Sequence, residues 1–209
     1  AADTIANSRV ITDENRVRHF ISMIKKENLR MNRQVESILQ IATLDKREMD
    51  FRFAPVDLHE VICQAIDTIE IQVADRGGVV HRHLDAERSI INGDTEHLRN
   101  LVHNLLDNAN KYSEKSPDIT VKTRSNDSGI FLQVADRGIG MSKSVQNRVF
   151  ERFYRETTGN IHNVKGFGLG LNYVKAIAEA HGGTITVESE QGEGSVFTIF
   201  LPFSNETRA

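Results

Sequence analysis

The chain has 209 residues, of which 39% are hydrophobic and 26% are charged, and this is enough for one buried core with an accessory element. Its net charge of −3 gives no electrostatic reason to expect nucleic acid as a partner, because proteins that bind nucleic acid usually carry a basic face. No stretch approaches the ~20 consecutive apolar residues that a membrane span requires. We therefore expect no nucleic-acid partner, no membrane contact within this chain, and a cytoplasmic location.

Residues 1–50 differ from the rest because they contain neither glycine nor proline. Apolar residues and one asparagine recur there in alternating steps of four and three, which is the heptad pattern of a helix that buries one seam. The seam consists of Val17, Ile21, Ile24, Asn28, Met31, Val35, Ile38 and Ala42. The pattern predicts a long amphipathic helix that either self-associates or packs on its own domain.

A capping signal marks the start of the next predicted helix. Asp57 followed by Glu60 resembles a capping box, and the glycine pair at 77–78 closes the apolar-faced helix that follows. Short strands are expected at 79–80 and 89–91, around a polar turn.

The remainder of the chain alternates between helix and strand signals. Asp94 is a suitable N-cap for a helix that runs to Tyr112. The strands that follow are expected as two antiparallel pairs, 119–123 with 130–134 and 184–187 with 195–200, the second pair preceded by a helix. The predicted fold class is α+β, a two-layer α/β sandwich with one mixed sheet and helices on one face, preceded by the long amphipathic helix.

Four short motifs stand in one order along residues 104–171 and carry most of the chemical information. They are Asn104–Tyr112 (NLLDNANKY), Asp136–Gly140 (DRGIG), Phe150–Arg155 (FERFYR) and Gly166–Leu171 (GFGLGL). Amide oxygens suit a magnesium ion, a carboxylate suits a base amino group, and a glycine loop that opens a helix suits phosphate. The set therefore favours a nucleotide as ligand.

These motifs resemble the N box, first glycine box, F box and second glycine box of bacterial sensor histidine kinases, members of the GHKL ATPase superfamily. The resemblance covers about residues 55–202. It implies a Bergerat-type ATP-binding fold, ATP with Mg²⁺ as cofactors, a catalytic ATP-binding domain at 55–205, and a partial dimerisation and histidine-phosphotransfer region at 1–50. It also allows the chain to be the cytoplasmic part of a membrane-anchored kinase.

Asn104 and Asn108 are four residues apart and share one helical face, so their amide oxygens can serve one metal ion. The resemblance assigns magnesium to Asn108 and places Asn104 near the phosphates and the metal. It also directs Lys111 to the phosphates, where its charge would act, and Tyr112 over the adenine. The alternative for each of these residues taken singly is an ordinary solvated helix residue, and the surrounding motif favours the site.

Asp136 follows an apolar strand, and the resemblance gives it the adenine 6-amino group as its hydrogen-bond donor. Gly138 and Gly140 would let the backbone turn close to the base, with Ile139 in apolar contact. The alternative for Asp136 is an ordinary turn aspartate.

The F box and the polar segment after it are expected to form a lid. Phe150 and Phe153 would anchor one end in the core, and Arg152 and Arg155 would reach phosphate oxygens as the lid closes. Free backbone N–H groups at the start of the following helix would bind phosphate. The loop residues assigned to the nucleotide are Gly166, Gly168, Leu169 and Gly170.

No histidine qualifies as the phosphate acceptor of such a kinase, which needs an acid next to it and usually a proline soon after. His59 is followed by Glu60, but the rest of the pattern is wrong and the residue belongs to a helix that packs on the core. We expect the acceptor to lie upstream of this chain, which would then not phosphorylate itself. His81 and His83 form a weaker alternative as a metal pair on one side of a strand.

The predicted reaction is transfer of the ATP terminal phosphoryl group to a histidine on a dimerisation helix, for relay to an aspartate of a response-regulator receiver domain. The expected partners are ATP, that receiver domain, and a second copy through the N-terminal helix. Three alternatives remain: an ATPase of the gyrase, mismatch-repair or heat-shock chaperone type, a degenerate dimerising scaffold, and a kinase that acts mainly as a phosphatase.

Overall fold

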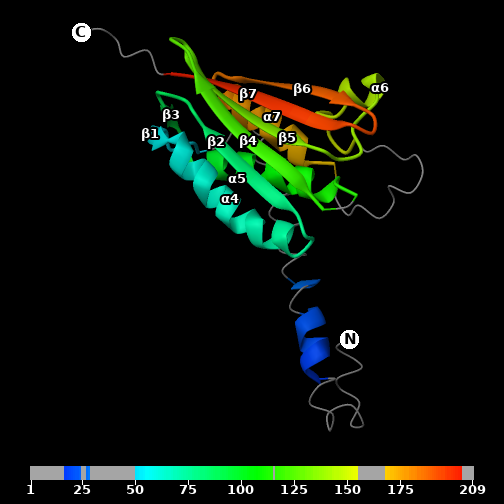
Figure 1. The fold of residues 1–209 in the computed structure, drawn as a ribbon. Helices are drawn as coiled ribbons and strands as arrows, with labels where there is room; N and C mark the ends of the chain where they lie inside the picture. Colours follow the sequence, from blue (N-terminus) through cyan, green and yellow to red (C-terminus); the bar gives the residue numbers. More distant parts are fainter. Residues whose placement is uncertain (1–16, 25–26, 29–49, 115, 155–167, 204–209) are drawn as a thin grey trace. The chain divides into compact units, whose positions relative to one another are not determined.

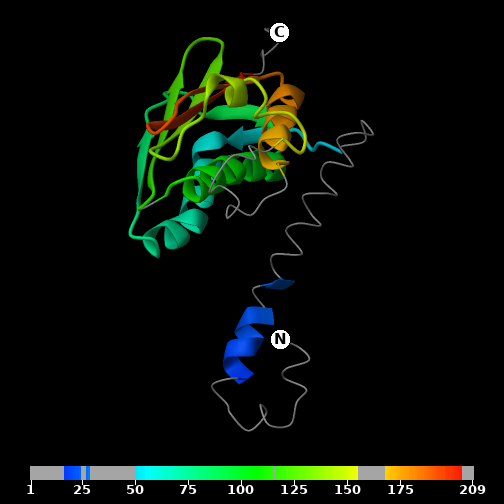
Figure 2. The same cartoon turned by 90° about the vertical axis from the view of Figure 1, so that its right-hand side faces the viewer.

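The structure is a computed structural model that describes residues 17–24, 27–28, 50–114, 116–154 and 168–203. The chain divides into two compact units, Ala1–Glu48 and Met49–Ala209, and each is considered by itself. The second unit contains the strands of the described part of the chain (Figures 1 and 2).

A five-stranded mixed sheet forms one layer of the second unit. Its order is β2-β4-β5-β7-β6, in which β2 is parallel to β4 and the other neighbours are antiparallel. The strands are β2 (Val79–Leu84), β4 (Asp118–Ser125), β5 (Gly129–Asp136), β6 (Thr184–Glu190) and β7 (Gly194–Pro202).

Three helices form the second layer and lie together on one face of this sheet (Figure 1). They are α4 (Leu58–Ala74), α5 (Thr95–Lys111) and α7 (Gly170–Ala180). The middle helix, α5, contacts both of the others and also β4 and β5. The predicted two-layer sandwich is therefore confirmed.

The core lies between the layers and follows the strand alternation expected of a sheet with one buried face. Alternate residues of β4 and β5 point at the helices and are buried, whereas their neighbours are half-buried or exposed. The fully buried residues of this core include Ile119, Val121, Ile130 and Leu132 from the strands, and Ile62, Ile66, Leu98, Leu101 and Leu105 from the helices.

Both helix starts that the sequence predicted are confirmed. Asp57 caps α4 by accepting the His59 N–H at 2.9 Å. Asp94 caps α5 through one carboxylate oxygen, which accepts the N–H groups of Glu96 and His97 at 3.0 Å each. Satisfying these otherwise unpaired N–H groups fixes where each helix begins.

The first two short strands are present as predicted, but they do not pair with each other. β2 lies beside β4, and β3 (Ile90–Gly93) pairs instead with β1 (Ala54–Asp57), a strand that the sequence did not predict. The short helix α6 (Lys143–Gln146) was also not predicted; Ser142 caps it by accepting the Val145 N–H.

The described part of the first unit is short. Residues 17–24 are helical, and Ile21 and Met23 are 53% and 48% exposed. The predicted seam beyond Asn28 lies outside the described residues. Within the residues that are described, no helix combines the length and apolar character needed to cross a bilayer.

Candidate functional site

Two amide side chains of α5 meet the first residue of α7. Asn104 and Asn108 are both half-buried on the predicted common face. A Cβ atom placed on Gly170 would lie 2.8 Å from Asn104 Oδ1 and 4.0 Å from Asn108 Nδ2. Glycine at position 170 therefore lets the start of one helix approach the amide face of another, which sequence reasoning did not anticipate.

The orientation of the Asn104 amide is set by its own helix. Its Nδ2 donates a hydrogen bond of 2.8 Å to the Asn100 carbonyl. Because the amide nitrogen is engaged in this way, the oxygen is the atom that faces Gly170. An oxygen in that position can ligate a hard cation such as Mg²⁺.

The predicted carboxylate stands at the end of β5. The Gly138 N–H donates to Asp136 Oδ1 at 2.8 Å, and the Ile139 N–H donates to the Tyr112 carbonyl at 3.1 Å. Burial raises the pKa of Asp136 to about 6, even though N–H groups of Gly138 and Ser195 bond to it and act in the opposite direction.

The glycines of this turn are required by close packing. A Cβ on Gly138 would lie 2.5 Å from the Tyr112 carbonyl oxygen. Gly140 has a φ of 64°, and a Cβ there would overlap the Glu190 carbonyl. The turn is consequently held against the end of α5 on one side and the end of β6 on the other.

The described part of the F box lies next to the second glycine motif. The Phe153 N–H donates to the Gly168 carbonyl at 3.1 Å, and both residues have positive φ, 59° and 70°. Phe150 packs edge-on against Phe197 at 6.4 Å, as expected of an anchor. Phe153 is 68% exposed, so the prediction that it is buried in the core is wrong.

The charged residues assigned to phosphate are found on the surface. Lys111 forms an ion pair with Asp107, one turn earlier on α5, and their spacing of four residues could have indicated this pair from the sequence. Tyr112 is half-buried at the end of the same helix, and Arg152 is exposed. Arg155 and Gly166 lie outside the described residues, as does most of the predicted lid.

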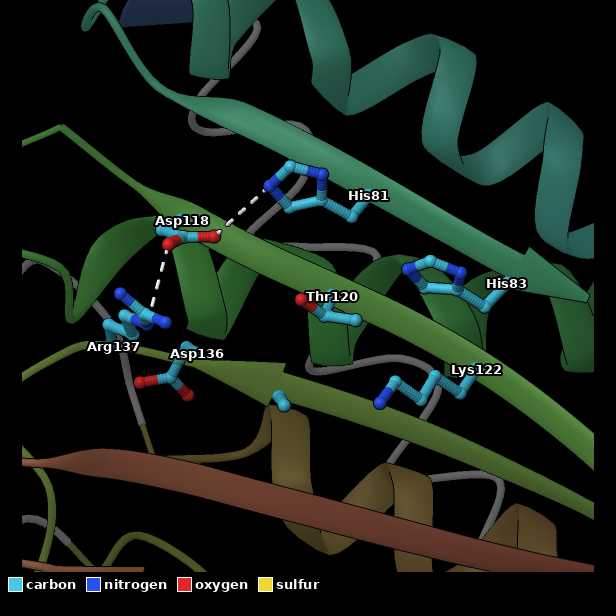
Figure 3. Close-up of a pocket in the computed structure, with 8 residues that line it drawn as sticks. His81, His83, Asp118, Thr120, Lys122, Asp136 and Arg137 are labelled. Carbon is cyan, nitrogen blue, oxygen red and sulfur yellow. Dashed lines mark ion pairs between the residues drawn. The ribbon is translucent and has the colours of Figure 1, made fainter.

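A pocket of about 280 Å³ lies on the face of the sheet opposite α4, α5 and α7, and Asp136 is among the residues that line it (Figure 3). Asp118 forms ion pairs there with His81 at 3.5 Å and Arg137 at 3.4 Å. The other lining residues are His83, Thr120, Lys122, Ala135 and Asp136. The described residues contain no group of three or more His, Cys, Asp or Glu side chains suited to a metal. His81 and His83 lie on the same side of β2, as predicted, and their use as a metal pair stays a prediction.

The fold and these motifs agree with comparisons to known proteins. The family described as "Histidine kinase-, DNA gyrase B-, and HSP90-like ATPase" matches residues 93–205. This range is more than half of the chain and contains both the amide pair and the Asp136 turn. The chain therefore belongs to this ATPase family.

The similar proteins are sensor kinases. The chain is 37% identical to sensor protein RprX of Bacteroides fragilis (strain YCH46) over 97% of its own length, and spans 39% of that protein. The mycobacterial sensor histidine kinase MprB is 29% identical, with a TM-score of 0.61 and coverage of 72% of this chain and 97% of that chain. Full-length ShkA, solved in complex with AMPPNP, is 25% identical with a TM-score of 0.75 and covers 89% of this chain and 38% of that chain.

Proposed function

We propose that residues 55–205 form a catalytic domain that binds Mg·ATP and transfers its terminal phosphoryl group to a histidine of a dimerisation helix. The observation that carries this proposal is the contact between Gly170 and the amides of Asn104 and Asn108. It brings the amide oxygen of Asn104, with the Asn108 amide beside it, next to a helix start that can hold phosphate, and a nucleotide requires both a cation ligand and a phosphate site.

The helix start is suited to phosphate in its own right. α7 begins after Leu169, which makes no side-chain capping hydrogen bond. The first N–H groups of the helix consequently have no side-chain acceptor at the N-cap, and a phosphate oxygen would satisfy them. Gly168, Leu169 and Gly170 would supply this contact together with Gly166.

The Asp136 turn would hold the base. An ionised carboxylate accepts a hydrogen bond from the 6-amino group of adenine, whereas guanine presents an acceptor at the same edge. Gly138 keeps the turn close to the end of α5 and Gly140 keeps it close to the end of β6, with Ile139 and Tyr112 as the neighbouring contacts.

The metal ligands would be Asn108 and, in support, Asn104. Their chemistry fits the ion because Mg²⁺ takes oxygen ligands and keeps several waters. Bound Mg²⁺ would neutralise charge on the phosphate oxygens. Lys111, Arg152 and Arg155 would provide further positive charge as the phosphoryl group is transferred.

In the transfer, the bond from the terminal phosphorus to the bridging oxygen of ATP breaks and a phosphorus–nitrogen bond to the acceptor imidazole forms, leaving ADP. Catalysis would consist mainly of positioning and charge neutralisation. The amide of Asn104 cannot accept a proton, which disfavours activation of water and therefore favours transfer over hydrolysis.

The domain would act as part of a larger signalling protein. The N-terminal region 1–50 would dimerise through its heptad seam, and the phosphoryl group would pass from the acceptor histidine to an aspartate of a receiver domain. A cytoplasmic location follows from the need for ATP and such a partner.

The metal assignment is tested by titrating AMPPNP into the chain by calorimetry, with and without Mg²⁺. We expect micromolar binding, about −8 kcal/mol, that Mg²⁺ strengthens in the native chain. Asn108→Ala should lose this strengthening, whereas Asn147→Ala, which alters an exposed asparagine after α6, should keep it. An Asn108→Ala protein that responds to Mg²⁺ like the native chain would remove Asn108 from the metal site.

A further inference from the structure

The segment that leads into the catalytic unit, residues 50–53 (the junction segment), packs on two histidines. The ring of Phe51 lies 4.9 Å from that of His97 and 5.8 Å from that of His181. The ring of Phe53 lies 4.9 Å from that of His181. These contacts connect the junction segment to the first turn of α5 and to the end of α7.

One carboxylate joins the junction segment to α5. Asp94 Oδ2 accepts the backbone N–H of Arg52 at 2.8 Å, while Oδ1 accepts the N–H groups of Glu96 and His97. Oδ1 caps α5 and Oδ2 holds the junction segment. A movement of α5 or of the junction segment that shifts this carboxylate would therefore disturb its hydrogen bond to the other element.

His181 completes the connection, and both of its ring nitrogens are engaged. The backbone N–H of Asp94 donates to Nε2 at 3.0 Å, and Nδ1 lies 2.8 Å from the Ile177 carbonyl. A carbonyl can only accept and an N–H can only donate, so the ring is neutral with its proton on Nδ1. The side chain has little freedom to leave this state, because the residue is only 7% exposed.

We propose that His181 is a positioning residue that holds the junction segment, the start of α5 and the end of α7 as one unit. The inference rests on the proposed function, because α5 carries Asn104 and Asn108 and α7 begins at Gly170. Movement of the junction segment would act on both helices through His181 and would thereby change how well the amide pair and the phosphate-binding helix start fit a nucleotide.

The surroundings of His181 make this connection sensitive to acid. Burial lowers the pKa of His181, while the Ile177 carbonyl and the charge of Asp94 oppose this effect and His97 adds to it. From the junction segment, the rings of Phe51 and Phe53 lie against the imidazole. Protonation of Nε2 would place a donor against the Asp94 N–H and break that bond. Because the pKa is lowered, this loss of anchoring should begin only at a pH below the ordinary titration range of histidine.

The proposal is tested by amide hydrogen exchange, followed by NMR and expressed as protection factors. His181→Phe keeps an aromatic ring against the junction segment but removes the acceptor, whereas His181→Gln can return an acceptor to the Asp94 N–H. We expect His181→Phe to lower the protection of the Asp94 and Arg52 amides about tenfold relative to the β4–β5 core, and His181→Gln to restore most of it.

A matched control separates positioning from general destabilisation. His59 is a partly buried histidine at the start of α4, and its Nε2 lies 2.9 Å from Thr123 Oγ1. His59→Phe should leave the ratio of Arg52 protection to core protection unchanged. If the ratio of Arg52 protection to core protection is the same in His181→Phe as in the native chain, the proposal is overturned.

Nucleotide linkage provides the functional arm of the test. Coupling between two sites is reciprocal, so AMPPNP with Mg²⁺ should raise the protection of the Arg52 amide in the native chain, by about fivefold, and should not do so in His181→Phe. If AMPPNP binds natively without changing Arg52 protection, the inference fails while the proposed function stands. If AMPPNP does not bind at all, the proposed function fails, and the exchange ratios alone decide whether His181 anchors the junction segment.

Discussion

Asp136 illustrates how the fold prepares one residue for its task. The carboxyl group stands at the end of a buried strand, where burial raises its pKa to about 6, yet the Gly138 N–H orients one of its oxygens. The group is therefore ionised at neutral pH at an energetic cost, which a hydrogen-bond donor from a ligand would offset.

The affinity for AMPPNP should consequently fall in mild acid. Between pH 7.5 and 5.5 the ionised fraction of a carboxyl group with a pKa of about 6 falls about fourfold, and binding that requires the carboxylate should weaken in proportion. Calorimetry at the two pH values, compared with Asp136→Asn to cancel titration of the phosphates, measures this difference. Equal pH dependence in both proteins would show that Asp136 does not contact the ligand as a carboxylate.

The same pKa shift has a consequence for stability. Because the pKa is higher in the folded chain than in an unfolded one, the protonated carboxyl stabilises the fold below pH about 4, and this contribution is lost as pH rises through about 6. The native domain should therefore lose stability relative to Asp136→Asn across that interval.

Gly170 is the residue whose substitution should separate binding from stability. A methyl group at position 170 would displace Asn104 Oδ1, but the side chain can swing away and alanine favours helix over glycine by about 1 kcal/mol. The free energy of unfolding of Gly170→Ala should therefore lie within about 1 kcal/mol of that of the native chain. Its AMPPNP affinity should fall about tenfold, which corresponds to about 1.4 kcal/mol.

A double-mutant comparison identifies the cause. In an Asn104→Ala background the oxygen that the methyl group displaces is absent, so Gly170→Ala should have little further effect on affinity. A full tenfold loss in that background would place the cause elsewhere in the loop.

At the scale of elements, local capping signals predicted α4 and α5 well because the cap chemistry is contained in a few neighbouring residues. Asp57 and Asp94 both act as predicted. Strand pairing was less predictable: β2 and β3 are neighbours in sequence, but β2 joins β4 through a crossover that contains α5. Short strands carry too little pattern to choose a partner, and packing of the helices decides it.

In the candidate site too, the sequence predicted what depends on local pattern and did not predict what depends on packing between elements. The spacing of Asn104 and Asn108 predicted their common face, since helical periodicity alone determines it. The contact of Asn104 with Gly170 depends on how α5 packs on α7, and this packing cannot be predicted from a local sequence pattern. Phe153 was expected in the core as a large apolar residue, yet its backbone lies in the left-handed region beside Gly168 and its side chain is exposed.

The amphipathic N-terminal helix leads to a prediction about assembly. Ile21 lies on the heptad seam and Met23 lies off it, although the two side chains are similarly exposed at 53% and 48%. Ile21→Asp should weaken self-association at least tenfold, because a buried seam isoleucine contributes about 1.5–3 kcal/mol, and Met23→Asp should have little effect. Sedimentation equilibrium measures both; equal effects would argue against the seam as the dimer contact.

At the scale of the second unit, the two faces of the sheet differ in what covers them. The helices cover one face, and the amide pair, the Asp136 turn and the start of α7 all belong to that layer or to its margin. The opposite face carries the open pocket around Asp118 (Figure 3). Two half-buried aspartates, Asp118 and Asp136, line this pocket, and only Asp136 is assigned to the nucleotide.

That pair allows the most direct test of the central claim, that this domain binds ATP through an adenine site at Asp136. AMPPNP with Mg²⁺ is titrated by calorimetry into the native chain, Asp136→Asn and Asp118→Asn, with a guanine analogue as a second ligand. The account predicts that the native chain and Asp118→Asn bind AMPPNP with micromolar affinity. Asp136→Asn should bind it at least tenfold more weakly, a loss of about 1.4 kcal/mol, and the guanine analogue should not bind with this affinity. Absence of binding by the native chain, or equal binding by all three proteins, would contradict it.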